Sequence, residues 1–387
     1  MKYYIIAGEA SGDLHGSNLI KELIKLDEPA NIRCWGGDLM EAAGAELVKH
    51  YRDLAFMGFI EVIRNLPTIL NNLKFCKKDI LDFKPDVVVL IDYPGFNLRI
   101  AKWAKENGFK VIYYISPQVW AWKESRTKMI KKVVDKMLVI LPFEKEFFAR
   151  WDYKVEYVGH PLAHLIDRFD RSNYTFITQS QSSTEKNDTK GIKTDDRDRI
   201  LLLPGSRKQE ILVKLPIMLG VTSYFPSYRF IIAQAPGQPY ELYKDLIASY
   251  PNVEVAFPGQ TYTLLSNAKA ALVTSGTATL ETALFGVPQV VCYKGSPVSY
   301  QIARRLLKIK YISLVNLIMD KLVVTELIQH DLTVENLKSE LDAILHNKER
   351  ISQIQKDYED LKQLLMQGGD ASQRAAQEIV EFVKASV

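Results

Sequence analysis

Cysteine is scarce in this chain, which contains only Cys34, Cys76 and Cys292 among its 387 residues. Three scattered thiols cannot all pair with one another, and their spacing matches no metal-binding motif. These facts exclude a disulfide-stapled secreted scaffold and a small zinc module. We therefore expect a protein that works in the reducing environment of the cytoplasm.

Long apolar runs are also missing. No stretch approaches the roughly 18 consecutive apolar residues that a membrane-spanning helix needs. The first apolar residues, 3–7, are followed at once by a glycine-rich acidic turn, so we expect no secretion signal. Any contact with a membrane is therefore expected to be peripheral.

Neither sign of charge dominates the sequence. The 50 Lys and Arg side chains stand against 46 Asp and Glu, a net charge of +4, so we expect no nucleic acid as a partner. Hydrophobic residues make up 47% of the chain, which is typical of a globular protein with a packed core. Because 387 residues exceed the size at which one core keeps growing, we expect two domains.

The strongest positive signal is a series of short apolar runs, rich in β-branched residues and separated by amphipathic helical stretches. The runs cover residues 3–7, 86–91, 110–115, 136–140, 200–203, 228–233, 270–273 and 289–292. Strands that are apolar on both faces belong to parallel sheets covered by helices on both sides. The sequence therefore predicts an α/β protein with two Rossmann-like, doubly wound domains.

One polar segment interrupts this pattern. Residues 172–198 are rich in Ser, Thr, Gln, Asn, Lys and Asp and have no apolar periodicity, which is typical of a linker or insertion. We expect an N-terminal domain over 1–171 and a C-terminal domain over 199–366. Beyond Val324 the pattern predicts helices only. The last of them, within 367–387, follows a Gly368-Gly369 break and would tie the two domains together by folding back over the first, a crossing that composition alone does not decide.

Ligands of open parallel sheets bind beyond the carboxyl ends of the strands, where helix N-termini present free N–H groups. In the first domain, residues 8–16 form a Gly/Ser-rich turn of this kind, without the GxGxxG or GKS/GKT signature. It is either a general ligand-binding turn or a structural one. Asp92 ends another strand, and it is either a base whose pKa is raised by burial or the N-cap of the next helix.

Two junctions of the second domain have residues suited to phosphate. Arg207 follows a strand, where it either binds a diphosphate through paired N–H groups or lies solvated at the surface. Ser275 and Thr277 stand at the open N-terminus of the next candidate helix. Glu281, one turn further, either accepts hydrogen bonds from ribose hydroxyls or is solvated.

Two motifs are weaker than they look. Asp196 and Asp198 spell the DxD of metal–nucleotide sites, but they lie in the polar segment without a preceding apolar strand. His160 and His164 lack the companions of a metal set, so a structural or interdomain role is expected for both. We expect no metal and no cofactor.

An apolar stretch over residues 54–70 is followed by Lys74, Lys77 and Lys78, and a second basic run covers 123–132. Such a combination is compatible with an acyl-binding or membrane-surface face. It is equally compatible with a helix that is buried against the sheet and has a solvated basic flank.

Six motifs together resemble the lipid-A-disaccharide synthase family, and they occur in the family's order. They are residues 8–13 (GEASGD), 91–97 (IDYPGFN), 116–122 (SPQVWAW), 203–207 (LPGSR), 275–281 (SGTATLE) and 311–316 (YISLVN). The resemblance covers nearly the whole chain except the polar segment. It implies a GT-B fold, two Rossmann-like domains with the nucleotide sugar bound mainly by the second, and a C-terminal segment that returns to the first.

The resemblance also implies a reaction. A UDP-activated diacylglucosamine is joined to a diacylglucosamine 1-phosphate with inversion, which gives a β(1→6) disaccharide and UDP in lipid A biosynthesis. The expected partners are these two lipids and the cytoplasmic face of the inner membrane, with a homodimer as a further expectation. A UDP-sugar 2-epimerase, another GT-B glycosyltransferase and a non-catalytic carrier are the alternatives.

The motifs also assign roles to single residues by resemblance. Asp92 is the essential carboxylate of the first domain, and Glu9, Asp13 and Ser11 belong to the acceptor side. Glu9 and Asp13 are further candidates for the base. On the UDP side the resemblance implies Arg207, Ser275, Thr277, Glu281 and Asn316.

Overall fold

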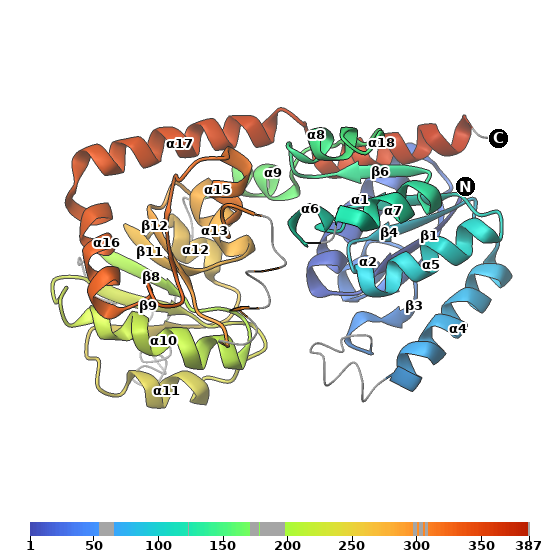
Figure 1. The fold of residues 1–387 in the computed structure, drawn as a ribbon. Helices are drawn as coiled ribbons and strands as arrows, with labels where there is room; N and C mark the ends of the chain where they lie inside the picture. The colour runs from blue at the N-terminus through green and yellow to red at the C-terminus, as the bar shows by residue number, and fades with distance from the viewer. Residues whose placement is uncertain are drawn as a thin grey trace. The chain divides into compact units, whose positions relative to one another are not determined.

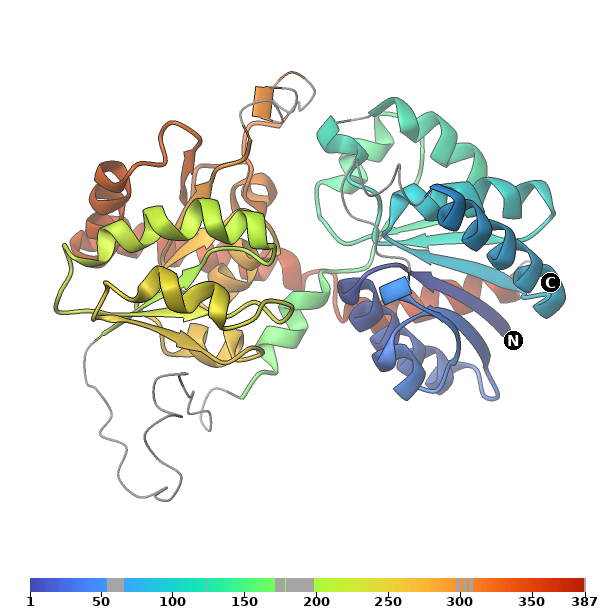
Figure 2. The same ribbon diagram turned by 90° about the horizontal axis from the view of Figure 1, so that it is seen from below.

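The computed structural model of the protein describes residues 1–53, 66–122, 124–170, 178, 198–296, 300–301, 305 and 309–385. The chain divides into two compact units, which we call unit 1 (residues 1–164 and 364–387) and unit 2 (residues 165–363). Each unit contains one parallel sheet with helices on both faces (Figures 1 and 2). The predicted doubly wound α/β fold is confirmed.

The sheet of unit 1 has seven strands in the order β3-β2-β1-β4-β5-β6-β7, all parallel. They are β1 (Lys2–Ala7), β2 (Asn31–Gly36), β3 (Glu46–His50), β4 (Val87–Ile91), β5 (Val111–Tyr114), β6 (Lys136–Val139) and β7 (Glu156–Tyr157). The central strands are buried on both faces, as their unbroken apolar sequences predict.

Two groups of helices cover this sheet. On one face α1 contacts α2 and α18, and on the other α5 contacts α4 and α7 (Figure 2). The helices and turns are α1 (Ala10–Leu26), α2 (Asp38–Ala42), η1 (Tyr51–Asp53), α4 (Leu66–Phe83), α5 (Pro94–Glu106), α6 (Val119–Trp122), η2 (Glu124–Arg126), α7 (Thr127–Val133), α8 (Glu144–Ala149) and α18 (Ala371–Lys384). Helix α9 (Pro161–Asp167) lies where the chain passes from unit 1 to unit 2.

The sheet of unit 2 has six parallel strands in the order β10-β9-β8-β11-β12-β13. They are β8 (Arg199–Leu203), β9 (Arg229–Ala233), β10 (Val253–Ala256), β11 (Ala270–Thr274), β12 (Gln289–Tyr293) and β13 (Thr325–Ile328). Its helices are α10 (Lys208–Thr222), α11 (Glu241–Ile247), α12 (Thr261–Ser266), α13 (Thr277–Leu284), α15 (Leu314–Met319), α16 (Val334–His346) and α17 (Lys348–Met366). The boundary between the units falls within α17.

All eight strands that the apolar runs predict are present. The sequence pattern misses β2 and the four edge strands β3, β7, β10 and β13. Edge strands are partly exposed, so polar residues break their apolar runs, as Glu254 does in β10 and Glu326 in β13. The expectation of helices only beyond Val324 is wrong, because β13 begins at Thr325 and completes the sheet.

The C-terminal segment belongs to unit 1, as the resemblance implies. The apolar face of α18, which includes Ala375, Ala376 and Ile379, lies in the same core cluster as β1 and α1. A close backbone contact between Gly159 and Gly368 precedes this helix. A Cβ on Gly368 would lie 2.1 Å from the Gly159 Cα, so any side chain there would separate the two segments.

Most of the predicted polar segment, residues 172–198, lies outside the described residues. Thr178 is described: it is fully buried and forms an isolated antiparallel bridge with Ala256 on the edge strand β10. A segment without apolar periodicity thus still supplies one partner to the open edge of the sheet.

Helix α4 presents an amphipathic surface. Tyr4 donates a hydrogen bond of 2.6 Å to Asp79 on α4, and Arg33 pairs with the same carboxylate at 3.0 Å, which fixes the inner face of the helix. The outer face has three apolar side chains that are nearly half exposed, with exposed lysines between them. We call this set the α4 face; it consists of Leu70, Lys74, Phe75, Lys78 and Leu81.

Residues 54–65 of the predicted apolar stretch lie outside the described part of the chain. Within the described part, no helix has the length and apolarity to cross a membrane.

Candidate active site

The first candidate site lies at the switch point of the unit 1 sheet. Strands β1 and β4 are neighbours, yet the chain continues from β1 toward β2 on one side and from β4 toward β5 on the other. The carboxyl ends of two such strands are where doubly wound sheets generally hold their ligands. Glu9 follows β1, and Asp92 follows β4.

Asp92 has an unusual backbone conformation. Its φ angle is +43° and that of Tyr93 is +47°, a left-handed pair that costs about 1–3 kcal/mol for each residue without glycine's freedom. Hydrogen bonds hold this turn. The Asp92 carbonyl accepts from Asn97 Nδ2 at 2.8 Å and from the Tyr113 hydroxyl, and the Asp92 N–H donates to the Tyr114 carbonyl at 3.2 Å.

The carboxylate of Asp92 lies in an environment that favours its protonated form. Burial is the main cause and the nearby charge of Glu9 the second, and together they raise the pKa of Asp92 to about 6, although a hydrogen bond from the Tyr93 backbone opposes them. Glu9 occupies the N-cap position of α1. The Tyr93 ring covers Gly8, where a Cβ would lie 2.2 Å from the ring, so this turn requires glycine.

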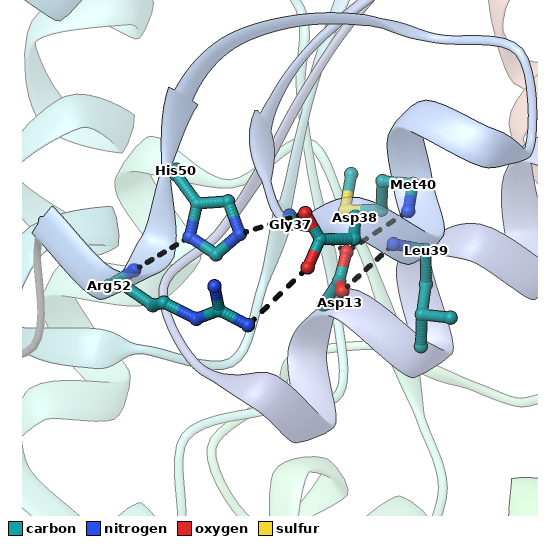
Figure 3. A network of polar contacts seen from close by, with 7 residues as sticks. All are labelled: Asp13, Gly37, Asp38, Leu39, Met40, His50 and Arg52. Carbon is teal, nitrogen blue, oxygen red and sulfur yellow. Dashed lines mark hydrogen bonds and ion pairs between the residues drawn. The ribbon is translucent and has the colours of Figure 1, made fainter.

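Asp13 is bound by the protein itself. Its carboxylate accepts backbone N–H groups from Gly37 at 2.8 Å, Leu39 at 3.2 Å and Met40 at 3.0 Å (Figure 3). Asp13 lies in α1, and its nearly fully buried carboxylate caps the N-terminus of the neighbouring helix α2. Asp13 thus ties the first turn of α1 to the start of α2.

The neighbouring polar groups of unit 1 are more exposed. Asp38 at the start of α2 pairs with His50 at 3.5 Å and with Arg52 at 3.4 Å (Figure 3). Ser11, in the first turn of α1, is exposed to solvent. The structure thus brings Glu9 and Asp92 together and gives Asp13 a separate structural contact.

The second candidate site is a pocket of about 310 Å³ at the switch point of the unit 2 sheet, between β8 and β11. Ser275, Thr277 and Glu281, all predicted from the sequence, line it. Further lining residues include Ser206, Gln234 and Thr274, which lie at or just beyond the ends of the neighbouring strands, and Glu210 in the first turn of α10. The N-terminus of α13 opens into this pocket, so its free N–H groups and dipole favour an anion.

Two side chains of the pocket are poised for hydrogen bonding. The Thr274 side chain is more than nine-tenths buried, and no partner for its hydroxyl exists among the described residues. The Glu281 carboxylate accepts a hydrogen bond of 3.0 Å from Tyr262. Burial raises the pKa of Glu281, and the Tyr262 hydrogen bond opposes that rise.

Arg207 lies beside the pocket at the N-cap of α10. Its guanidinium is two-thirds exposed and lies 3.6 Å from Glu210, which also lies 3.9 Å from the buried Lys214. Burial lowers the pKa of Lys214, and the Glu210 charge opposes that effect. Glu210, which lines the pocket, thus lies between the exposed guanidinium of Arg207 and the buried ammonium of Lys214.

Asn316 has a different environment from the other predicted ligands. Its amide donates to the Val324 carbonyl at 2.8 Å and to Glu326 at 2.9 Å, and its oxygen accepts from the N–H groups of Val323 and Val324. This fully satisfied side chain fixes the connection between α15 and β13. Its predicted contact with the substrate stays a prediction.

Within the part of the chain that the structure describes, no three His, Cys, Asp or Glu side chains form a group that could hold a metal ion. Of the DxD sequence, only Asp198 is described, and it pairs with Lys269 at 2.6 Å. His160 is buried, and its Nδ1 accepts the Leu162 N–H. That turnover is independent of divalent metals stays a prediction.

Four polar residues at these sites were missed from the sequence. Asn97 and Tyr113 bind the turn at Asp92, and Thr274 and Tyr262 belong to the unit 2 pocket. Asn97 lies five residues after Asp92 inside a recognised motif, so it had a local signal. The hydrogen bonds of Tyr113 and Tyr262 reach residues at the end of another strand or on another helix, so no local sequence pattern predicts them.

The two doubly wound units and their likeness to solved structures define the fold. The chain superposes on a UDP-GlcNAc 2-epimerase from Neisseria meningitidis with bound UDP-GlcNAc at a TM-score of 0.64, with 15% identity and full coverage of both chains. It matches the calicheamicin glycosyltransferase CalG4 at a TM-score of 0.61, with 15% identity over 100% of this chain and 99% of the other. These likenesses show the fold alone, which is GT-B.

Sequence comparison gives the family. The family model for lipid-A-disaccharide synthetase matches residues 3–381. The lipid-A-disaccharide synthase of Syntrophus aciditrophicus is 40% identical, with 99% of this chain and 98% of the relative covered, and that of Geobacter metallireducens is 37% identical, with 98% and 96% covered. The chain belongs to the lipid-A-disaccharide synthase family, the glycosyltransferases of lipid A biosynthesis.

The raised pKa of Asp92 predicts a stability cost. Because the folded pKa of about 6 exceeds the ordinary 3.8, ionisation opposes folding, and stability falls as pH rises from about 4 to about 6. We expect Asp92→Asn to raise the free energy of unfolding by about 1–3 kcal/mol at pH 7.5 and by much less at pH 4. Urea denaturation at both pH values measures this, with Asp82→Asn on the exposed side of α4 as the control. An equal effect at both pH values would contradict the charge argument.

Proposed function

We propose that this protein joins UDP-2,3-diacylglucosamine to 2,3-diacylglucosamine 1-phosphate. The products are the β(1→6)-linked disaccharide 1-phosphate and UDP, and the configuration at the donor C1 is inverted. The proposal combines family membership with two chemically different sites, one suited to an anionic leaving group and one with a carboxylate of raised pKa.

The pocket of unit 2 is the proposed donor site. The N-terminus of α13 and the hydroxyls of Thr274 and Thr277 can donate hydrogen bonds to a diphosphate, whereas the Ser275 hydroxyl, which also lines the pocket, donates to the Ile312 carbonyl at 2.9 Å. Arg207 at the rim supplies a positive charge for the leaving UDP. Glu281 can accept hydrogen bonds from the ribose diol, and Tyr262 orients its carboxylate.

Asp92 is the proposed general base, and its position and raised pKa carry the proposal. Inversion requires the acceptor 6-hydroxyl to attack C1 from the face opposite UDP while the C1–O bond to UDP breaks. Asp92 takes the hydroxyl proton, and UDP leaves with the bond electrons. A carboxylate with a pKa of about 6 is mostly ionised at pH 7 yet basic enough to assist.

Glu9, Ser11 and Asp13 complete the proposed acceptor side in different ways. Glu9 raises the proton affinity of Asp92 through its charge, and the exposed Ser11 is free to meet the sugar phosphate at the start of α1. Asp13 fits a positioning role better than a proton transfer, because three N–H groups occupy its carboxylate.

The α4 face is the proposed contact with the inner membrane. Exposed Leu70, Phe75 and Leu81 can enter the headgroup boundary, while Lys74 and Lys78 attract anionic lipids. This surface would keep the enzyme beside its two lipid substrates on the cytoplasmic side. A homodimer stays a prediction.

The decisive assay mixes the protein with acylated UDP-glucosamine and acylated glucosamine 1-phosphate and measures UDP and disaccharide. We expect Asp92→Asn to lower kcat by at least about 10²-fold with nearly unchanged affinity for UDP, because the amide keeps the size but accepts no proton. In the native enzyme kcat/KM should rise with pH through an apparent pKa of about 6. Near-native turnover of Asp92→Asn would make Glu9 the candidate base. Conversion of UDP-sugar without release of UDP would instead support an epimerase.

The donor site predicts a second pattern of loss. Arg207→Ala removes the positive charge that attracts the diphosphate, and Glu281→Ala removes the carboxylate that accepts hydrogen bonds from the ribose. Each substitution should therefore weaken UDP binding by about 10-fold or more. Isothermal titration with UDP measures this, with Lys269→Ala on the far end of the sheet as the control. Unchanged affinity in both variants would move the donor site elsewhere.

The α4 face predicts salt-dependent binding to anionic vesicles. The double variant Lys74→Gln/Lys78→Gln should lose most of the salt-sensitive binding to vesicles. The double variant Leu70→Ser/Leu81→Ser should lose the binding that persists at high salt. Sedimentation at low and high salt measures both, and Leu212→Ser, at an equally exposed position on α10, is the matched control. If the native protein fails to bind at low salt, the α4 face is no membrane surface.

A further inference from the structure

Asn97 makes an unusual set of contacts for a buried side chain. It is fully buried in the first turns of α5, and its Nδ2 lies 2.8 Å from the Asp92 carbonyl, 3.1 Å from that of Ile91 and 3.4 Å from that of Ile6. These carbonyls belong to the carboxyl ends of β1 and β4. One amide thus ties together the two strand ends that form the switch point.

Tyr113 holds the same turn from the other side. It lies on β5, the next strand, and is fully buried. Its hydroxyl donates to the Asp92 carbonyl that also accepts from Asn97. A peptide that is bound by two side chains from two elements cannot rotate without breaking a buried hydrogen bond, which leaves a polar group unsatisfied.

The peptide that these two hydrogen bonds hold belongs to Asp92, whose backbone conformation is unfavourable. A left-handed φ at both Asp92 and Tyr93 is unfavourable for residues other than glycine, and an extended strand would direct the Asp92 side chain differently. The hydrogen bonds from Asn97 and Tyr113 favour the left-handed turn over that alternative. They therefore determine the direction in which the Asp92 Cα–Cβ bond leaves the strand.

We propose that Asn97 and Tyr113 are positioning residues that fix the left-handed turn at Asp92 and thereby aim its carboxylate at the acceptor hydroxyl. This inference rests on the proposed role of Asp92 as the base. Neither residue needs to touch a substrate. Their effect should fall on the proton-transfer step and not on binding of the nucleotide by unit 2.

The experiment compares two tyrosine-to-phenylalanine variants. Tyr113→Phe removes the hydroxyl at the Asp92 carbonyl. Tyr153→Phe removes the hydroxyl of another buried tyrosine of unit 1, which donates to the Val134 carbonyl at 3.1 Å. Val134 precedes β6, so this hydrogen bond lies near the amino ends of the strands, away from Asp92 at their carboxyl ends. Both variants lose one buried hydrogen bond in unit 1, so both should melt about 2–4 °C lower.

Activity should separate the two variants. We expect Tyr113→Phe to lower kcat by about 3- to 10-fold and Asn97→Ala by about 10- to 100-fold, with the Kd for UDP within about twofold of the native value. Tyr153→Phe should keep kcat within about twofold. If Asn97→Ala fails to fold, the comparison of kcat between Tyr113→Phe and Tyr153→Phe still tests the positioning role.

The pH profile supplies a readout that general destabilisation does not move. Burial raises the pKa of Asp92 most, the charge of Glu9 raises it further, and the hydrogen bond from the Tyr93 backbone opposes both, whereas the side chains of Asn97 and Tyr113 bind the Asp92 carbonyl. A released turn exposes the carboxylate to water, so the acid limb of kcat/KM should move to lower pH by at least about half a unit in the Asn97 and Tyr113 variants only.

The outcomes distinguish this inference from the proposed reaction. If Asp92→Asn is inactive while Tyr113→Phe and Asn97→Ala keep native turnover and an unmoved acid limb, the positioning role is overturned and the base survives. Equal activity losses in Tyr113→Phe and Tyr153→Phe would also overturn it. If Asp92→Asn itself is active, the base assignment fails first, and the positioning role fails with it.

Discussion

The parallel arrangement of the strands is the constraint on which the rest of this structure depends. In each sheet every strand ends at the same edge, and the chain leaves two neighbouring strands in opposite directions, β1 and β4 in unit 1 and β8 and β11 in unit 2. Each switch point collects side chains that are far apart in sequence. Asp92 meets the charge of Glu9 in one, and Thr274 shares the other with Ser206.

The polar groups differ between the carboxyl ends of the two sheets. In unit 1, Glu9 and Asp92 lie together, and burial favours the protonated form of Asp92. In unit 2, the N-terminus of α13 and the Thr274 and Thr277 hydroxyls favour an anion in the pocket. The left-handed turn at Asp92 persists because Asn97 and Tyr113 hold it, an example of local strain offset by buried hydrogen bonds.

The final helix shows how a distant segment completes a core. Helix α18 contributes an apolar face to the core of β1 and α1, although more than 340 residues of chain separate α18 from α1. The backbone contact between Gly159 and Gly368 brings the returning chain close to the loop after β7. Unit 1 is therefore built from two separate stretches of chain, whereas unit 2 is one continuous stretch.

The sequence by itself determined the fold class, because buried parallel strands must be apolar on both faces, and every such run became a strand. It also marked Asp92, Ser275, Thr277 and Glu281, since strand ends and helix starts are local features. Only the tertiary structure decided the edge strands, whose polar residues hide them, and the separate contacts of Asp13 and Asn316, whose partners lie on other elements. The raised pKa of Asp92 and the buried, unpartnered hydroxyl of Thr274 within the described chain likewise come from burial, a property that no single segment possesses.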